Sequence, residues 1–82
     1  MASRWLFVRI RAAERALQDG RIDEALAAAT QPDVRDHRRG RRLLDELARP
    51  LVARARLHLQ AGRYQPALED LDRLSAIGHA GP

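Results

Sequence analysis

The chain has 82 residues, enough for one small domain, and its 15 basic against 11 acidic residues give a formal net charge of +4. It has no cysteine, which excludes disulfides and thiolate metal sites. No apolar run approaches the roughly 20 residues that are needed to cross a bilayer. We therefore expect a cytoplasmic protein that does not enter a membrane.

The residue types favour helices. Apolar residues make up 45% of the chain, many of them alanine and leucine, and aromatic residues make up only 4%. The β-branched and aromatic residues that usually fill strands are scarce. All the basic residues are arginine, and the net charge alone supports only a modest attraction for anions.

Two helices are predicted in the first third of the chain. Apolar residues recur there at the spacing of one helical face: Leu6, Ile10, Ala13 and Leu17. This pattern predicts a helix over 1–19, which Gly20 closes. A second helix is predicted over 21–29. It ends before Pro32, because the residue that precedes a proline is displaced from the α region.

The next segment leaves two alternatives open, and so does a proline further on. Residues 33–42 contain one apolar residue and are either a polar extension of the following helix or a loop. A long apolar stripe comes next: Leu43, Leu47, Leu51, Ala55 and Leu59. At Pro50 either a new helix starts or one long helix kinks, and the unbroken stripe favours the kinked helix. Gly62 ends it, and a last helix is predicted over 64–77.

Two parts of the chain match each other, because Gly62 follows Gly20 by 42 positions and the same offset joins further identical residues. The pairs are Ala13 and Ala55, Leu17 and Leu59, Gln18 and Gln60, Arg21 and Arg63, Ala25 and Ala67, and Leu26 and Leu68. Glycine permits a tight turn, and alanine allows two antiparallel helices to approach closely. We therefore predict one helical hairpin that is used twice.

In these residues the chain resembles the tetratricopeptide repeat family, whose units are helix–turn–helix hairpins of about 34 residues. The matching residues are Ala13, Leu17, Gly20, Ile22, Ala25 and Ala29 in the first unit, and Ala55, Leu59, Gly62, Tyr64, Ala67, Leu71 and Leu74 in the second. The chain departs from the family in its longer period and in His58, which stands where an aromatic residue is usual. The resemblance implies a superhelical stack whose first helices line a concave surface for a peptide or partner helix.

The expected fold is all-α, an antiparallel bundle of four helices in two hairpins, the third helix being long. We expect a single domain over 1–82, made of a first hairpin over 3–31, an Arg-rich joint over 32–42, a second hairpin over 43–77 and a tail over 78–82. Two units are fewer than the three or more that such folds usually need. We therefore expect either a homo-oligomer or further repeats beyond Pro82.

Seven residues are candidates for partner binding. They are Trp5, Phe7, Arg11, Gln18, Arg49, Arg56 and Gln60. The four consecutive apolar residues at 5–8 cannot all face one core, so Trp5 or Phe7 is expected to stay exposed for self-association or docking. The arginines could hold an acidic peptide through bidentate hydrogen bonds, or they are solvated surface residues of their helices.

The densest charge in the chain is a possible anion patch. It consists of Arg35, Arg38, Arg39, Arg41 and Arg42, next to His37. No aromatic residue lies among them to stack on a base, and Asp33 and Asp36 dilute the positive charge, so a solvated joint is favoured over nucleic-acid binding. No nucleophile–base pair, Gly-rich phosphate loop or zinc spacing appears, and we expect no catalytic, cofactor or metal site.

The sequence thus predicts a non-catalytic module that binds a protein or peptide partner, in particular an acidic one, and that could form the first part of a larger protein. Two alternatives stay open. One is an Arg-dependent domain for nucleic acid or phosphate, and the other is an architectural dimerisation domain.

Overall fold

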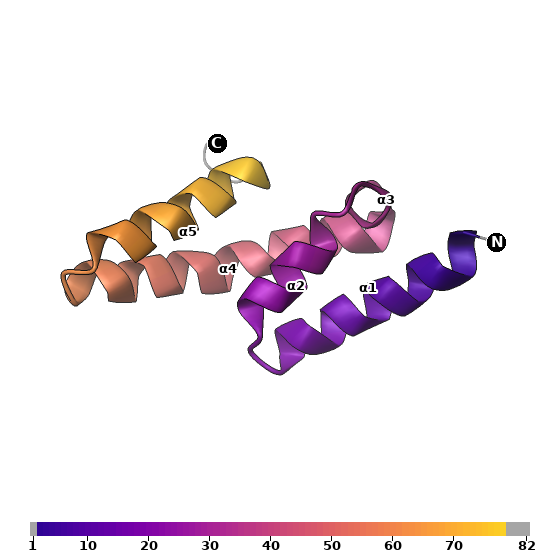
Figure 1. The fold of residues 1–82 in the computed structure, drawn as a ribbon, viewed down its shortest axis with the longest axis horizontal. Helices are drawn as coiled ribbons and strands as arrows, with labels where there is room; N and C mark the ends of the chain where they lie inside the picture. The colour runs from indigo at the N-terminus through magenta and orange to yellow at the C-terminus, as the bar shows by residue number, and fades with distance from the viewer. Residues whose placement is uncertain (1, 79–82) are drawn as a thin grey trace. The chain divides into compact units, whose positions relative to one another are not determined.

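The computed structural model describes residues 2–78, and side chains from residue 4. Within this range it holds five helices and no strand: α1 (Ala2–Gln18), α2 (Ile22–Ala29), α3 (Pro32–Arg35), α4 (Arg38–Gln60) and α5 (Tyr64–Ala76) (Figure 1). The predicted all-α class is confirmed. The expected tail lies, apart from Gly78, outside the described residues.

The helix count differs from the expected four because residues 32–35 form a helix of their own. Pro32 takes the first turn of α3, where its missing N–H costs no hydrogen bond. The sequence allowed either a helix or a loop over 33–42. This segment is mostly helical, with a short link between α3 and α4. The ring Nδ1 of His37 accepts the backbone N–H of Arg39 at 3.1 Å and caps the start of α4.

The chain divides into two compact units, 1–47 and 48–82, and the boundary falls inside α4. No helix in the described part of the chain combines the length and the apolar character that a membrane span requires. The long helix α4 runs without interruption through Pro50, so no new helix starts there.

The two predicted turns have the same backbone structure. Gly20 and Gly62 take positive φ angles of 80° and 76°. The N–H of Gly20 donates to the carbonyl of Leu17 at 3.0 Å, and that of Arg21 donates to Ala16 at 2.8 Å. Gly62 and Arg63 repeat this pattern at the end of α4. Both helices thus end in a Schellman motif, in which a glycine supplies the left-handed residue.

The alanines that were predicted at the helix contacts, Ala25 and Ala67, are both fully buried. Ala13 and Ala55, on the preceding helices, are buried as well. The two copies differ in the leucine that follows the second alanine: Leu26 in unit 1 is 8% exposed, whereas Leu68 in unit 2 is 55% exposed. The two copies thus share their turns and their buried alanines, and they differ in the exposure of the leucine that follows.

The core of unit 1 lies where α1, α2, α3 and the first turns of α4 meet. Its largest fully buried side chains are Ile10, Val34, Leu43 and Leu47. Gly40 is buried in this core, and a Cβ placed on it would overlap the carbonyl oxygen of Val34 and lie 3.2 Å from the Val34 Cγ1. The backbones of α3 and α4 approach so closely at this point that only glycine fits.

Candidate functional site

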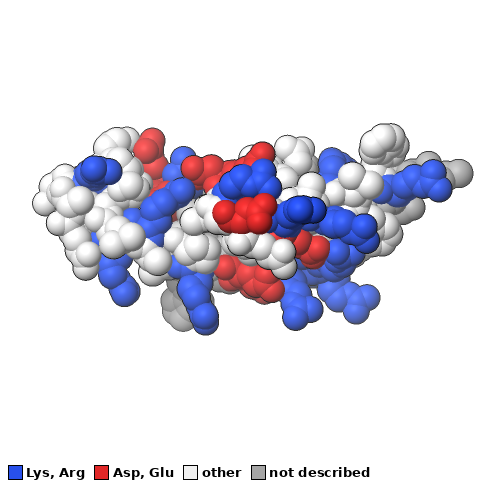
Figure 2. All heavy atoms as spheres, turned by 90° about the horizontal axis from the view of Figure 1, so that it is seen from below, with Lys and Arg blue, Asp and Glu red and all other residues white. Residues whose placement is uncertain are grey.

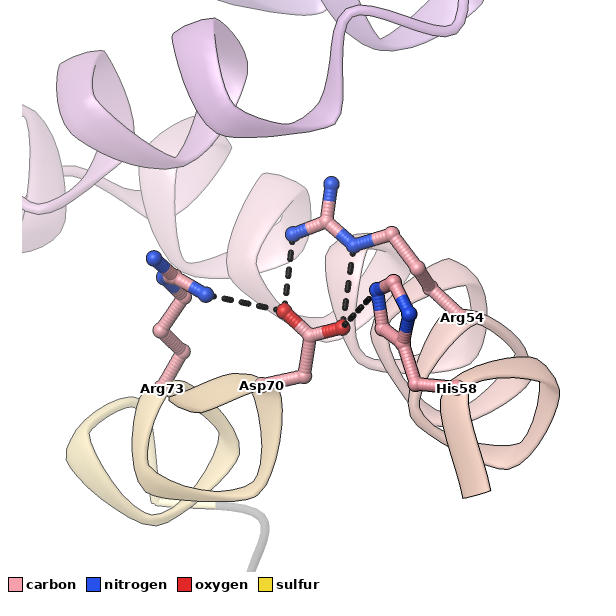
Figure 3. Close-up of polar contacts among 4 residues, drawn as sticks. All are labelled: Arg54, His58, Asp70 and Arg73. Atoms are coloured by element: carbon pink, nitrogen blue, oxygen red, sulfur yellow. Dashed lines mark hydrogen bonds and ion pairs between the residues drawn. The ribbon is translucent and has the colours of Figure 1, made fainter. Parts of the chain in front are cut away.

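Unit 2 contains a buried carboxylate that two helices surround with cations (Figure 3). Asp70 of α5 is 1% exposed. Arg54 of α4 donates from Nε to its Oδ2 at 3.0 Å and from Nη2 to its Oδ1 at 2.8 Å, which is a bidentate pair. Arg73, one turn further along α5, donates from Nη1 to Oδ1 at 2.8 Å. The Nε2 of His58 lies 3.9 Å from Oδ2.

The charges around Asp70 determine the direction in which its pKa is shifted. Burial by itself raises the pKa of Asp70, but the hydrogen bonds and charges of Arg54, followed by those of Arg73, outweigh it and hold the pKa below the ordinary 3.8. The carboxylate is therefore ionised at neutral pH. In the described residues no buried side-chain nitrogen or oxygen lacks a hydrogen-bond partner. The cluster joins α4 to α5 and fixes their register.

A pH dependence follows from the direction of this shift. A carboxylate whose pKa is lower in the folded than in the unfolded protein adds stability above the unfolded pKa, and this contribution is lost as the pH falls through the folded pKa. We expect the stability advantage of the wild type over Asp70→Asn to shrink as the pH is lowered from neutral to about pH 3. Urea unfolding of both proteins across this range measures it. An advantage that stays constant would contradict the assignment.

Unit 1 has a polar contact of its own between α1 and α4. Glu14 accepts hydrogen bonds from Nη2 of Arg39 at 2.6 Å and from Nε at 3.3 Å, and this interaction raises the pKa of Arg39. The Arg39 guanidinium carbon lies 6.0 Å from the centre of the Phe7 ring, which meets His37 edge-on at 5.6 Å. An ion pair between Arg9 and Asp33 joins α1 to α3.

An open groove of about 380 Å³ lies beside this contact, between α1 and α4 within unit 1. It is lined by Glu14, Leu17, Gln18, Arg39, Arg42, Leu43 and Glu46. Leu43 is buried and Leu17 is half-buried, so the floor is apolar. Arg42, with a side chain 82% exposed, stands on the rim 3.7 Å from Glu46. The groove combines an apolar floor with a basic group that a ligand can reach.

A second groove in unit 1, of about 200 Å³, corresponds to the place that the Asp70 cluster occupies in unit 2. The 42-residue offset matches Arg54, His58 and Asp70 with Ala12, Ala16 and Ala28 of the first hairpin. These three alanines line the groove. The positions that hold a buried ion cluster in unit 2 are thus occupied by alanines in unit 1, where Arg15, Arg21 and Glu24 complete the groove lining.

The seven predicted partner-binding residues are all exposed: Trp5, Phe7, Arg11, Gln18, Arg49, Arg56 and Gln60. On α1, Phe7, Arg11 and Gln18 share one face, because they lie four and seven residues apart. Trp5, 69% exposed, lies two residues before Phe7 and therefore faces nearly the opposite side of α1. On α4 the other three residues share a face of unit 2 for the same reason. Of the seven, only Gln18 lines the groove between α1 and α4.

The five arginines of the predicted anion patch do not form one uniform surface. Arg39 pairs with Glu14, Arg35 lies 3.4 Å from Asp36, and Arg42 lies 3.7 Å from Glu46. Arg41 donates to the backbone carbonyl of Asp36 at 3.2 Å, and Arg38 is exposed. Acidic side chains lie among the basic ones on the face shown in Figure 2. The positive charge is thus distributed and largely compensated.

The Asp70 cluster and the groove were not found from the sequence. Asp70 lies between Ala67 and Leu74 at the spacing of their buried face, and an acid at such a position is the signal that could have revealed a buried charge. The described residues contain no group of three or more potential metal ligands. No protein-family model, curated protein or solved structure matches this chain.

Proposed function

We propose that this chain is a non-catalytic protein-interaction module of helical hairpins, related in design to tetratricopeptide repeats, which binds an acidic peptide or partner helix. The observation that supports it most is the groove of unit 1 between α1 and α4. It offers the apolar floor and polar rim that are usual in sites for amphipathic helices.

Two arginines and two glutamates line the groove, and Arg42 is the charged group in it that is most open to an acidic ligand. Arg39 is held in place by two hydrogen bonds from its guanidinium to Glu14. Arg42 makes only a long, exposed contact with Glu46, and such pairs contribute little to stability. A ligand carboxylate can therefore replace Glu46 at the Arg42 guanidinium at small cost, while an apolar side chain of the ligand covers Leu17.

The test is a titration of the isotope-labelled protein with a short amphipathic peptide that carries leucines at helical spacing and glutamates between them. We expect amide chemical-shift changes at Leu17, Gln18 and Arg42. Arg42→Glu should weaken binding by about tenfold, because it removes a charge-assisted contact and adds repulsion. The same peptide with lysine in place of glutamate should bind more weakly.

The matched control is Arg38→Glu, which makes the same charge change on the same helix at an exposed residue outside the groove lining. This variant should bind the acidic peptide nearly as well as the wild type. Equal losses in Arg38→Glu and Arg42→Glu would show a general attraction between charges. Shift changes outside the groove residues would also contradict the proposal.

A further inference from the structure

Unit 2 carries an exposed apolar surface that the groove of unit 1 does not involve. Its members, here called the apolar face, are Val52 and Leu59 of α4 and Tyr64, Leu68 and Leu71 of α5. Each is between 41% and 66% exposed. The α4 pair is seven residues apart, and the α5 residues lie at i, i+4 and i+7, so each set forms a stripe along its helix.

The two stripes lie on the same side of the hairpin. On α4 the buried residues Leu51 and Ala55 separate the stripe from Arg54, and on α5 Ala67 and Leu74 separate it from Asp70. Arg54 and Asp70 meet on one side of the hairpin (Figure 3). Because α5 runs back along α4 after the turn at Gly62 (Figure 1), the opposite flanks of both helices share the other side. The stripes thus form one continuous surface.

The internal duplication shows what kind of occupant this surface fits. In unit 1 the matching positions are Ile10, Leu17, Ile22, Leu26 and Ala29. Three of these are buried and two are half-buried, whereas all five members of the apolar face are exposed. In unit 1 a further helix lies next to these positions, because Leu17 lines the same groove as Leu43 of α4. The apolar face of unit 2 is therefore of the kind that another helical surface covers.

The charges at its edges indicate which helices cover it. Arg49 and Arg56 flank the stripe on α4, and Glu69 and Asp72 flank the stripe on α5, all four being exposed. One edge is thus basic and the other acidic. A second copy turned by a two-fold axis parallel to the helices places its α5 over α4 of the first copy. Each basic edge then meets an acidic edge, and this happens twice by symmetry.

We propose that the apolar face binds the same face of a second copy of this chain, and that the two hairpins form a four-helix bundle in which α4 packs antiparallel to the partner's α5. All helix neighbours in such a bundle are antiparallel, and its core consists of the two apolar faces. Closed two-fold symmetry uses the surface completely and limits the assembly to a dimer.

The test is sedimentation equilibrium of the full chain over a range of concentrations. The wild type should reach twice the mass of one chain and no more. Leu68→Glu should raise the dimer dissociation constant at least about tenfold, because it buries a charge in the interface. Leu57→Glu is the matched control. It makes the same change on α4 at a residue that is 64% exposed and outside the apolar face, and it should leave the dimer intact.

A charge exchange tests the arrangement of the helices. Arg56→Glu and Glu69→Arg should each weaken the dimer, and the double variant should regain most of the affinity, because the two edges become complementary again. Circular dichroism verifies that each variant is folded. A monomeric wild type, a mass that grows beyond the dimer, or equal effects of Leu57→Glu and Leu68→Glu would overturn the proposal. A double variant that is weaker than both single variants would overturn the pairing of α4 with α5.

Discussion

Replacing Gly40 with alanine is expected to lower the free energy of unfolding by about 3 kcal/mol or more. Inside a helix this substitution ordinarily stabilises a protein by up to about 1 kcal/mol, because alanine loses less backbone entropy. Here the added methyl group would overlap the carbonyl oxygen of Val34. The obstacle is backbone, so no side-chain rotation can relieve it, and α3 must move away from α4.

Urea unfolding followed by circular dichroism measures this loss, and Gly20→Ala provides the comparison. A Cβ at Gly20 meets no atom within 4 Å. The free energy of unfolding of that variant therefore falls only because alanine disfavours a positive φ, by about 1 kcal/mol. Gly40→Ala should therefore be clearly the less stable of the two. A neutral or stabilising effect at Gly40 would show that the helices do not approach as closely as described.

The second large effect is expected at Asp70. Asp70→Asn should reduce the free energy of unfolding by about 2 to 4 kcal/mol, since it leaves two guanidinium groups beside a neutral side chain. Asp70 alone accepts three hydrogen bonds from Arg54 and Arg73. An asparagine offers one acceptor atom, and its NH₂ group turns a donor toward these donors.

Asp19→Asn is the matched control, since it makes the same change just after α1 at an exposed side chain and should alter stability by at most about 0.5 kcal/mol. A double replacement, Arg54→Leu with Asp70→Leu, should lower the free energy of unfolding by less than Asp70→Asn does. The double replacement removes both charges of the buried pair, whereas Asp70→Asn removes only one of them. The first hairpin has Ala12 and Ala28 at the positions that match Arg54 and Asp70, so it packs without a counterpart of that ion pair. Similar losses in Asp70→Asn and Asp19→Asn would contradict the role of the cluster.

Helix ends could be predicted from the sequence where a single residue determines the backbone. Gly20 and Gly62 are such positions, because a left-handed residue at a helix end is nearly always a glycine. The segment 33–42 could not be resolved in this way. Its structure depends on the contact between Gly40 and Val34 and on the ring of His37, which are tertiary details that no local periodicity reports.

For the candidate sites, too, the sequence predicted exposure but not the contacts between helices. The four apolar residues in a row predicted that Trp5 or Phe7 stays exposed, and both side chains are exposed. The pairing of Arg54 with Asp70 joins two helices across a turn, and the pairing of Arg39 with Glu14 joins residues 25 apart. Hydrophobic spacing predicts which face of a helix is buried, and it does not predict which charged residues meet.

The difference between the two hairpins also bears on which helices pair with one another during folding. Four helices with duplicated turns and alanines invite exchange, in which α1 would pair with α5 in place of α2. Such an exchange would seat Asp70 against Ala12 without Arg54, and an acid buried beside a methyl group is costly. We therefore expect the ion cluster of the second hairpin to favour the pairing of α4 with α5 over pairing with α1 or α2.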